Sequence, residues 1–225
     1  MSDATQSATP GAASHDPQRP ERLLALMTTG WAPRAEQLPA PAPGAAARAV
    51  RRQALVASFP GEWLVVPTGN VQVRSNDTDH RFRAGTEFAH LVGSHQPDAV
   101  LVVDPAGEAV LYQAPSMDRS TPAFFTDRMQ GELWVGPRPS LAATSALLGM
   151  STRPLEELDK LGGTAARVVR GLDARVEALF DLDEERDVEL ATALSELRLV
   201  KDAHEVAQLQ DAVDATVRGF EDVVR

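Results

Sequence analysis

The most restrictive feature of the sequence is the run Ala99-Val-Leu-Val-Val103, which is apolar at every position and is followed by the turn Asp104-Pro-Ala-Gly107. A strand with one solvated face alternates apolar and polar side chains, so an unbroken run indicates a strand that is covered on both faces. The run Glu62-Trp-Leu-Val-Val-Pro67 also has the character of a buried strand. With helical segments between the strands, the sequence predicts an α/β fold.

The remaining elements follow from hydrophobic periodicity and from glycine and proline breaks. The stripe of the helix expected at 187–199 includes Val188, Ala191 and Leu194. Residues 113–131 are expected to form a polar loop. The expected helices are 20–27, 45–58, 141–148, 155–161 and 187–199, and the expected strands are 62–67, 88–92, 99–103, 109–112, 132–135 and 166–169.

A polar run, Ser75 to Asp79, follows the alternating residues Val71 and Val73. Such a run is costly to bury, so it is expected at a strand end that faces solvent or a partner. Asp77 and Asp79 then have two interpretations, an Asx turn or a carboxylate that meets the amino group of a ligand. Trp134 likewise has two, core packing at a strand end or the aromatic wall of a pocket or interface.

The last segment is the clearest helix. Asp202 is expected to be its N-cap, and Glu205, three residues later, completes a capping box. Its apolar residues lie on one helical face, which needs something to pack against. We therefore expect the chain to stop at the start of a second domain. The residues of this stripe are Val206, Leu209, Val213, Val217, Phe220 and Val224.

Composition excludes several classes of function. The net charge of −10 argues against nucleic acid as a ligand, because phosphate binding needs a concentrated basic surface. The absence of cysteine excludes disulfides, thiolate metal sites and cysteine nucleophiles. The histidines, including His90 and His95, lack the local spacing of metal ligands, so we expect no metal site in this chain. With no apolar run near membrane-helix length and no signal peptide, the default expectation is a cytoplasmic protein.

Four stretches follow one another in a characteristic order: 51–55 with Pro60-Gly61, 74–102, Glu132-Leu-Trp-Val-Gly136 with Arg138, and 196–202 with Glu205. Together they resemble the aminopeptidase P family of proline-specific, pita-bread metallopeptidases. The resemblance covers about residue 45 to the end, whereas the proline-rich front, 1–44, has no counterpart in it. Ala89-His90 also departs from it, since aromatic residues are common there.

The resemblance implies an N-terminal α/β domain with a mixed sheet over 45–198, after a disordered or weakly ordered extension, 1–44. Residues 199–225 would then be the start of a truncated catalytic domain. That domain would bind two manganese ions and remove the N-terminal residue that precedes a proline, with no nucleic-acid or membrane partner. The metal ligands would lie beyond residue 225, so this chain alone is expected to hold no metal and to be inactive.

Two positions carry over from the family pattern as substrate-binding residues. Asp77 matches an aspartate that reaches the substrate pocket, and Trp134 matches a tryptophan that a neighbouring subunit presents at the pocket mouth, which implies a homo-oligomer at full length. A distal substrate arginine has two candidates, Arg175 and Arg186. The alternatives within the fold are a prolidase-like dipeptidase and a creatinase-like hydrolase, and outside it a non-catalytic protein-binding module.

Overall fold

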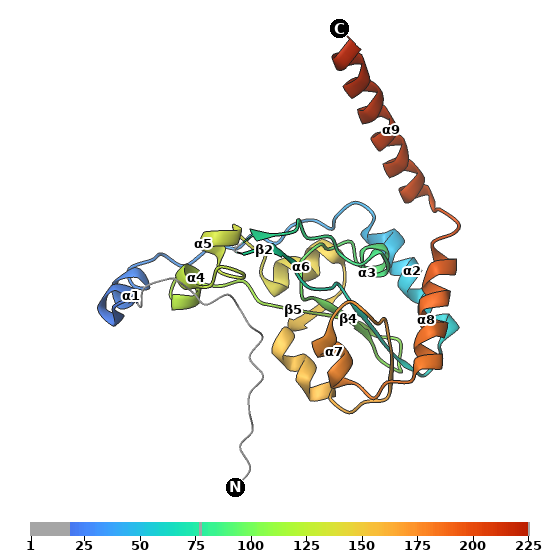
Figure 1. Cartoon of the computed structure of the whole chain (residues 1–225), viewed down its shortest axis with the longest axis horizontal. Coiled ribbons are helices and arrows are strands. Elements are labelled where there is room, and N and C mark those ends of the chain that lie inside the picture. The colour runs from blue at the N-terminus through green and yellow to red at the C-terminus, as the bar shows by residue number, and fades with distance from the viewer. Residues whose placement is uncertain (1–18, 77, 225) are drawn as a thin grey trace. The chain divides into compact units, whose positions relative to one another are not determined.

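The computed structural model describes residues 19–76 and 78–224, and the chain divides into two compact units (Figure 1). The first 18 residues of the extension expected over 1–44 lie outside the described residues. The larger unit takes in Glu36–Asn70, Arg83–Pro115 and Pro139–Arg225, and the smaller unit takes in Met1–Ala35, Val71–Phe82 and Ser116–Arg138.

The larger unit is built on a five-stranded sheet in its described part. The strands lie in the order β6 (Ser151–Pro154), β5 (Ala109–Gln113), β4 (Val100–Val103), β1 (Trp63–Pro67) and β7 (Ala166–Val168). β4 is antiparallel to β1 and to β5, whereas β7 is parallel to β1 and β6 is parallel to β5. The α/β fold and its mixed sheet are therefore confirmed, and the apolar runs form β4 and β1, two of the three inner strands.

Alternate residues of these inner strands enter two separate cores. Leu64 and Leu101 face one core, which contains side chains of α2 (Ala45–Ser58), α3 (Thr86–Leu91), α6 (Leu141–Leu148) and α8 (Glu184–Leu197). Val65 and Val102 face the other core, which contains side chains of the 3-10 helix η1 (Leu155–Leu161) and of α7 (Ala174–Leu179). The sheet is thus covered on both faces, which is why its central strands are apolar throughout.

A buried carboxylate closes the outer side of β7. The amide of Val169 donates to the carbonyl of Val65 in β1, at 3.0 Å. The preceding amide, that of Val168, therefore points away from β1, and it donates to Asp187 Oδ1 of α8 at 2.7 Å. The other oxygen of Asp187 accepts from Arg170 Nε at 2.6 Å. Asp187 thus fixes α8 to the edge of the sheet.

Three predictions of secondary structure are wrong. Residues 88–92, expected as a strand, fall largely in the helix α3, because Phe88, Leu91 and Val92 are spaced three and four apart and are all buried. Residues 132–135, also expected as a strand, form the short helix α5 (Glu132–Val135). The loop expected over 113–131 contains a further helix, α4 (Pro122–Thr126), which has its proline at the first position.

The stripe predicted for α8 is wrong in part, since Leu194 is buried as expected but Val188 is not. Val188 is 59% exposed, and the buried face is formed by Asp187, Leu190 and Leu194. A search for apolar periodicity passes over Asp187, because it gives no sign that the carboxylate is satisfied by the backbone of β7.

The smaller unit contains α1 (Glu21–Met27), α4, α5 and a hairpin of β2 (Val73–Ser75) with β3 (Thr78–Asp79). The helix predicted at 20–27 is confirmed. Trp31, which follows α1, packs on Phe125 of α4 with ring centroids 6.3 Å apart. The guanidinium of Arg119 also lies over the Trp31 ring, with its Cζ 4.8 Å from the ring centroid. Aromatic contacts therefore tie the segment after α1 to α4.

The final helix, α9 (Ala203–Val224), begins with the predicted capping box. The amide of Glu205 donates to Asp202 Oδ1 at 2.9 Å, and the amide of Asp202 donates to Glu205 Oε2 at 3.1 Å. None of its residues is buried, and the apolar residues of the stripe are 51–83% exposed.

Candidate functional site

Trp134 lies on α5 in the smaller unit, where its ring is half-exposed. Its indole Nε1 donates to the carbonyl of Phe125 at 2.9 Å, and the guanidinium of Arg128 lies 5.2 Å from the ring centroid. With 48% of its surface exposed, the side chain is fixed at its polar end and presents an aromatic face to solvent. Such a fixed, accessible ring suits contact with a ligand or a partner.

Gly131 allows α5 to begin directly against α4. A Cβ at this position would collide with the carbonyl oxygens of Ala123, Phe124 and Asp127. The amide of Gly131 itself donates to the Asp127 carbonyl at 2.8 Å. The close approach of the two short helices, which places Trp134 over Phe125, therefore depends on the absence of a side chain at this position.

A hollow of about 700 Å³ lies beside α5 within the smaller unit. Its buried carboxylate, Glu132, accepts from Arg34 Nη1 at 2.9 Å and from the amide of Met117 at 3.2 Å. Trp31, Arg119 and Phe124 contribute aromatic and cationic walls. Trp134 is not among the residues that line it, whereas its neighbour Leu133 is.

The polar run that contains Asp77 lies at the β2–β3 hairpin. Its residues on either side of Asp77 are exposed, as expected for a strand end that faces solvent. Asn76 adopts the left-handed conformation with φ of 47°, and Ser75 Oγ lies 3.1 Å from Thr78 Oγ1. Asp77 itself lies outside the described residues, so its predicted role and its relation to Trp134 remain predictions.

The two candidates for the distal arginine differ in their surroundings. Arg186 Nη2 donates to Glu62 Oε2 at 2.6 Å, in a cluster where Arg167 Nε also donates to Glu62 Oε2 at 2.6 Å. Hydrogen bonds from Arg167 and then Arg186 lower the pKa of Glu62 to about 2. Arg186 is therefore engaged in an ion-pair cluster that fixes the position of α8 relative to β1 and β7.

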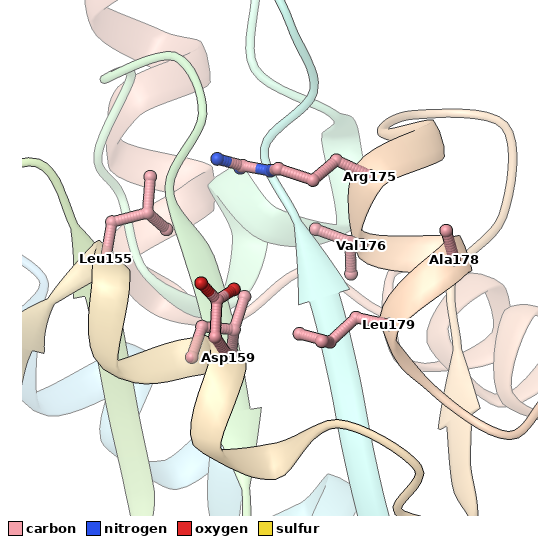
Figure 2. Close-up of a pocket in the computed structure, with 7 residues that line it drawn as sticks. Leu155, Asp159, Arg175, Val176, Ala178 and Leu179 are labelled. Carbon is pink, nitrogen blue, oxygen red and sulfur yellow. The ribbon is translucent and has the colours of Figure 1, made fainter. Parts of the chain in front are cut away.

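Arg175 is the freer of the two candidates. Its side chain is 52% exposed, and Nη2 lies 3.1 Å from Asp173 Oδ2. It lines a cavity of about 240 Å³ between η1 and α7. Figure 2 shows Arg175 extending from α7 across one side of this space, with Asp159 of η1 and Leu179 of α7 facing each other on the other side.

A cluster that the sequence analysis did not identify joins three helices of the larger unit. Arg51 of α2 donates to Asp202 Oδ2 through Nε and Nη2, at 2.9 and 2.6 Å, and to the carbonyl of His90 through Nη1 at 2.9 Å. His90 Nδ1 lies 3.2 Å from Glu205 Oε1. Burial lowers the pKa of His90, and Arg51 adds to this effect, against the attraction of Glu205. The capping box was the only sequence signal for this cluster.

Within 19–76 and 78–224, no three side chains of His, Cys, Asp or Glu come together in a way that holds a metal ion. No helix in the same residues has the length and apolarity to cross a membrane.

Sequence comparison identifies close relatives. The family model described as "Aminopeptidase P, N-terminal domain" matches residues 49–169, from α2 through β7. "Xaa-Pro aminopeptidase 1" of Streptomyces coelicolor is 47% identical over 216 residues, which are 91% of this chain and 43% of the relative. "Xaa-Pro aminopeptidase 2" of the same organism is 46% identical over 210 residues, 90% of this chain and 44% of the relative. The chain thus spans less than half the length of these relatives.

The fold is also found in solved structures. Aminopeptidase P from E. coli with the inhibitor Pro-Leu superposes with a TM-score of 0.55, over 72% of this chain and 40% of that chain. The sequence identity is 22%, so this likeness concerns the fold alone.

Proposed function

The chain belongs to the aminopeptidase P family, and on this premise we propose that it is the N-terminal, non-catalytic domain of a manganese-dependent Xaa-Pro aminopeptidase. The observation that carries the proposal is the 47% identity to "Xaa-Pro aminopeptidase 1" over 91% of the chain. The substrate would be a peptide with proline in the second position, from which the first residue is removed.

We propose that the catalytic residues belong to a different domain of a longer protein. Two kinds of support exist: the chain spans 43% of its relative, and the family match is to an N-terminal domain. We propose the boundaries 1–44 for an extension, 45–198 for the N-terminal domain and 199–225 for the start of the catalytic domain. On this basis the chain alone does not hydrolyse peptides, and the full-length protein is a cytoplasmic homo-oligomer.

Within this scheme, Trp134 and Asp77 are proposed to contact the substrate. The support for Trp134 is its geometry, because an indole held at Nε1 by Phe125 keeps its exposed face in one orientation. A rigid aromatic side chain contributes contact area at low conformational cost, and it packs well against a proline ring. Asp77 would supply a carboxylate from the exposed hairpin.

The proposal is tested on the native protein, captured from source cells with an antibody against residues 45–200. We expect an intact mass well above 24.1 kDa and release of the first residue from Xaa-Pro peptides, lost on chelation and restored by manganese. Cleavage confined to dipeptides would indicate a prolidase-like enzyme instead. A native mass near 24.1 kDa without hydrolysis would overturn the proposal in favour of a binding module.

A further inference from the structure

The first turn of α9 is held by α2 and α3 through a single arginine. All three guanidinium nitrogens of Arg51 are used: Nε and Nη2 donate to Asp202, and Nη1 donates to the carbonyl of His90 at the end of α3. Nη2 also lies 3.5 Å from Glu205 Oε2. The Arg51 side chain is only 11% exposed, whereas that of Asp202 is 37% exposed, so the guanidinium is held in one orientation by charge-assisted bonds at the edge of the unit.

Two further contacts hold the same turn. His90, whose side chain is 5% exposed, places Nδ1 3.2 Å from Glu205 Oε1. Gly44, the residue before α2, has φ of +79° and leaves room for the ring of His204, with which a Cβ would collide. The first turn of α9 is therefore fixed from three sides, by the start of α2, the middle of α2 and the end of α3.

Beyond this turn α9 has no buried residue, and the structure describes the helix over its whole length of Ala203–Val224. An α-helix is stiff over 22 residues, so its direction follows from how its first turn is held. Both carboxylates of the capping box serve two purposes, since they cap the helix and bind Arg51. The direction of α9 and its start are thus coupled through the same side chains.

We propose that Arg51, Asp202, Glu205 and His90 form a joint that sets the direction in which α9 leaves the α/β unit, with Arg51 as its positioning residue. If, as proposed above, α9 begins the catalytic part, the joint also sets how the N-terminal domain lies over the substrate. This consequence for catalysis rests on the proposed function, whereas the joint itself does not.

The joint is tested on the chain by distance measurement between two spin labels. The sequence has no cysteine, so labels placed through Glu156→Cys on η1 and Arg218→Cys on α9 are the only reactive thiols. We expect a narrow distance distribution in the parent chain and a broadened or shifted one after Arg51→Gln. Arg153→Gln, which removes an exposed arginine of β6 that pairs with Glu157 at 3.9 Å, is the matched control and keeps the distribution narrow.

A second variant separates the joint from the helix cap. Asp202→Ser retains a good N-cap residue but removes the carboxylate that Arg51 binds, so it should change the distribution as Arg51→Gln does. Circular dichroism confirms that each variant is folded. Folded Arg51→Gln and Asp202→Ser chains with the parent's narrow distribution would overturn the proposal.

The consequence for catalysis is measured on the full-length native enzyme. Arg51→Gln and Asp202→Ser should raise the KM for an Xaa-Pro peptide by about tenfold with manganese content unchanged, because misplaced substrate contacts weaken binding without touching the metal. Arg153→Gln should leave KM unchanged. An unchanged KM in the joint variants would remove the catalytic role, whereas a parent enzyme without any peptidase activity would instead remove the proposed function.

Discussion

The carboxylate of Asp187 accepts the backbone amide of Val168 at 2.7 Å, across the gap between α8 and the edge strand β7. Asp187 is 3% exposed and also binds Arg170, so its removal leaves a buried amide and an arginine without their acceptor. We expect Asp187→Ala to lower the free energy of unfolding by about 2–4 kcal/mol, measured by urea denaturation. Glu185→Gln, at an exposed position of the same helix, is the control and should change it little.

Acid should weaken the fold through Glu62. Its pKa is lowered to about 2 from an ordinary 4.5 by its bonds to Arg167 and Arg186. A carboxyl group with a depressed folded pKa stabilises the fold above its unfolded pKa, and this contribution is lost as pH falls from 4.5 towards 2. Urea denaturation between neutral and acid pH should show a smaller loss for Glu62→Gln than for the parent chain. Equal losses would contradict the role of the cluster, and Glu156→Gln, at an exposed site, should follow the parent.

Two substitutions of Trp134 test separately its contribution to stability and its contribution to substrate binding. Trp134→Phe keeps an aromatic ring but loses the bond to Phe125, which should cost about 1 kcal/mol of stability in the smaller unit. In the full-length enzyme, Trp134→Ala should raise the KM for an Xaa-Pro peptide, because the exposed ring face is lost. Val135→Ala, a neighbouring exposed position, is the control. A KM that is equal in Trp134→Ala and Val135→Ala would show that the ring does not contact the substrate.

Two glycines should respond to alanine in opposite directions. Gly131→Ala forces a Cβ against three carbonyl oxygens, so we expect faster hydrogen exchange throughout α4 and α5. Gly219 lies in the exposed C-terminal half of α9 with nothing near its Cβ position, and there alanine should stabilise the helix by about 1 kcal/mol. For Gly219→Ala we expect slower hydrogen exchange in α9. Unchanged exchange in α4 and α5 of Gly131→Ala would contradict the close contact between Gly131 and the three carbonyl oxygens.

Much of the fold could be predicted because local pattern and tertiary environment agree. The runs 62–67 and 99–103 are apolar throughout because both faces of β1 and β4 are covered. The Asp202–Glu205 capping box is a local hydrogen-bond pattern, so four residues of sequence suffice to predict it. The hairpin of β4 and β5 follows in the same way from the turn at 104–107.

The failures concern short elements and long-range partners. Around Phe88 and Trp134, four to six residues carry too little periodicity to separate a helix from a strand. Arg51 and Asp202 are 151 residues apart in sequence, and nothing local indicates that one binds the other. Arg186 could not be distinguished from Arg175, because its engagement with Glu62 depends on the packing of α8 against the sheet.

The two edges of the sheet have a consequence for self-association. An edge strand with free amides is a template for a strand of another molecule, and so a starting point for aggregation. On β7 the outward amide of Val168 is occupied by a side chain of the same molecule, and on β6 the edge ends in Pro154, which has no amide to offer. A strand of another molecule would find the Val168 amide already bonded at the β7 edge and no amide at Pro154 on the β6 edge. Both features disfavour association of the α/β units through their sheets.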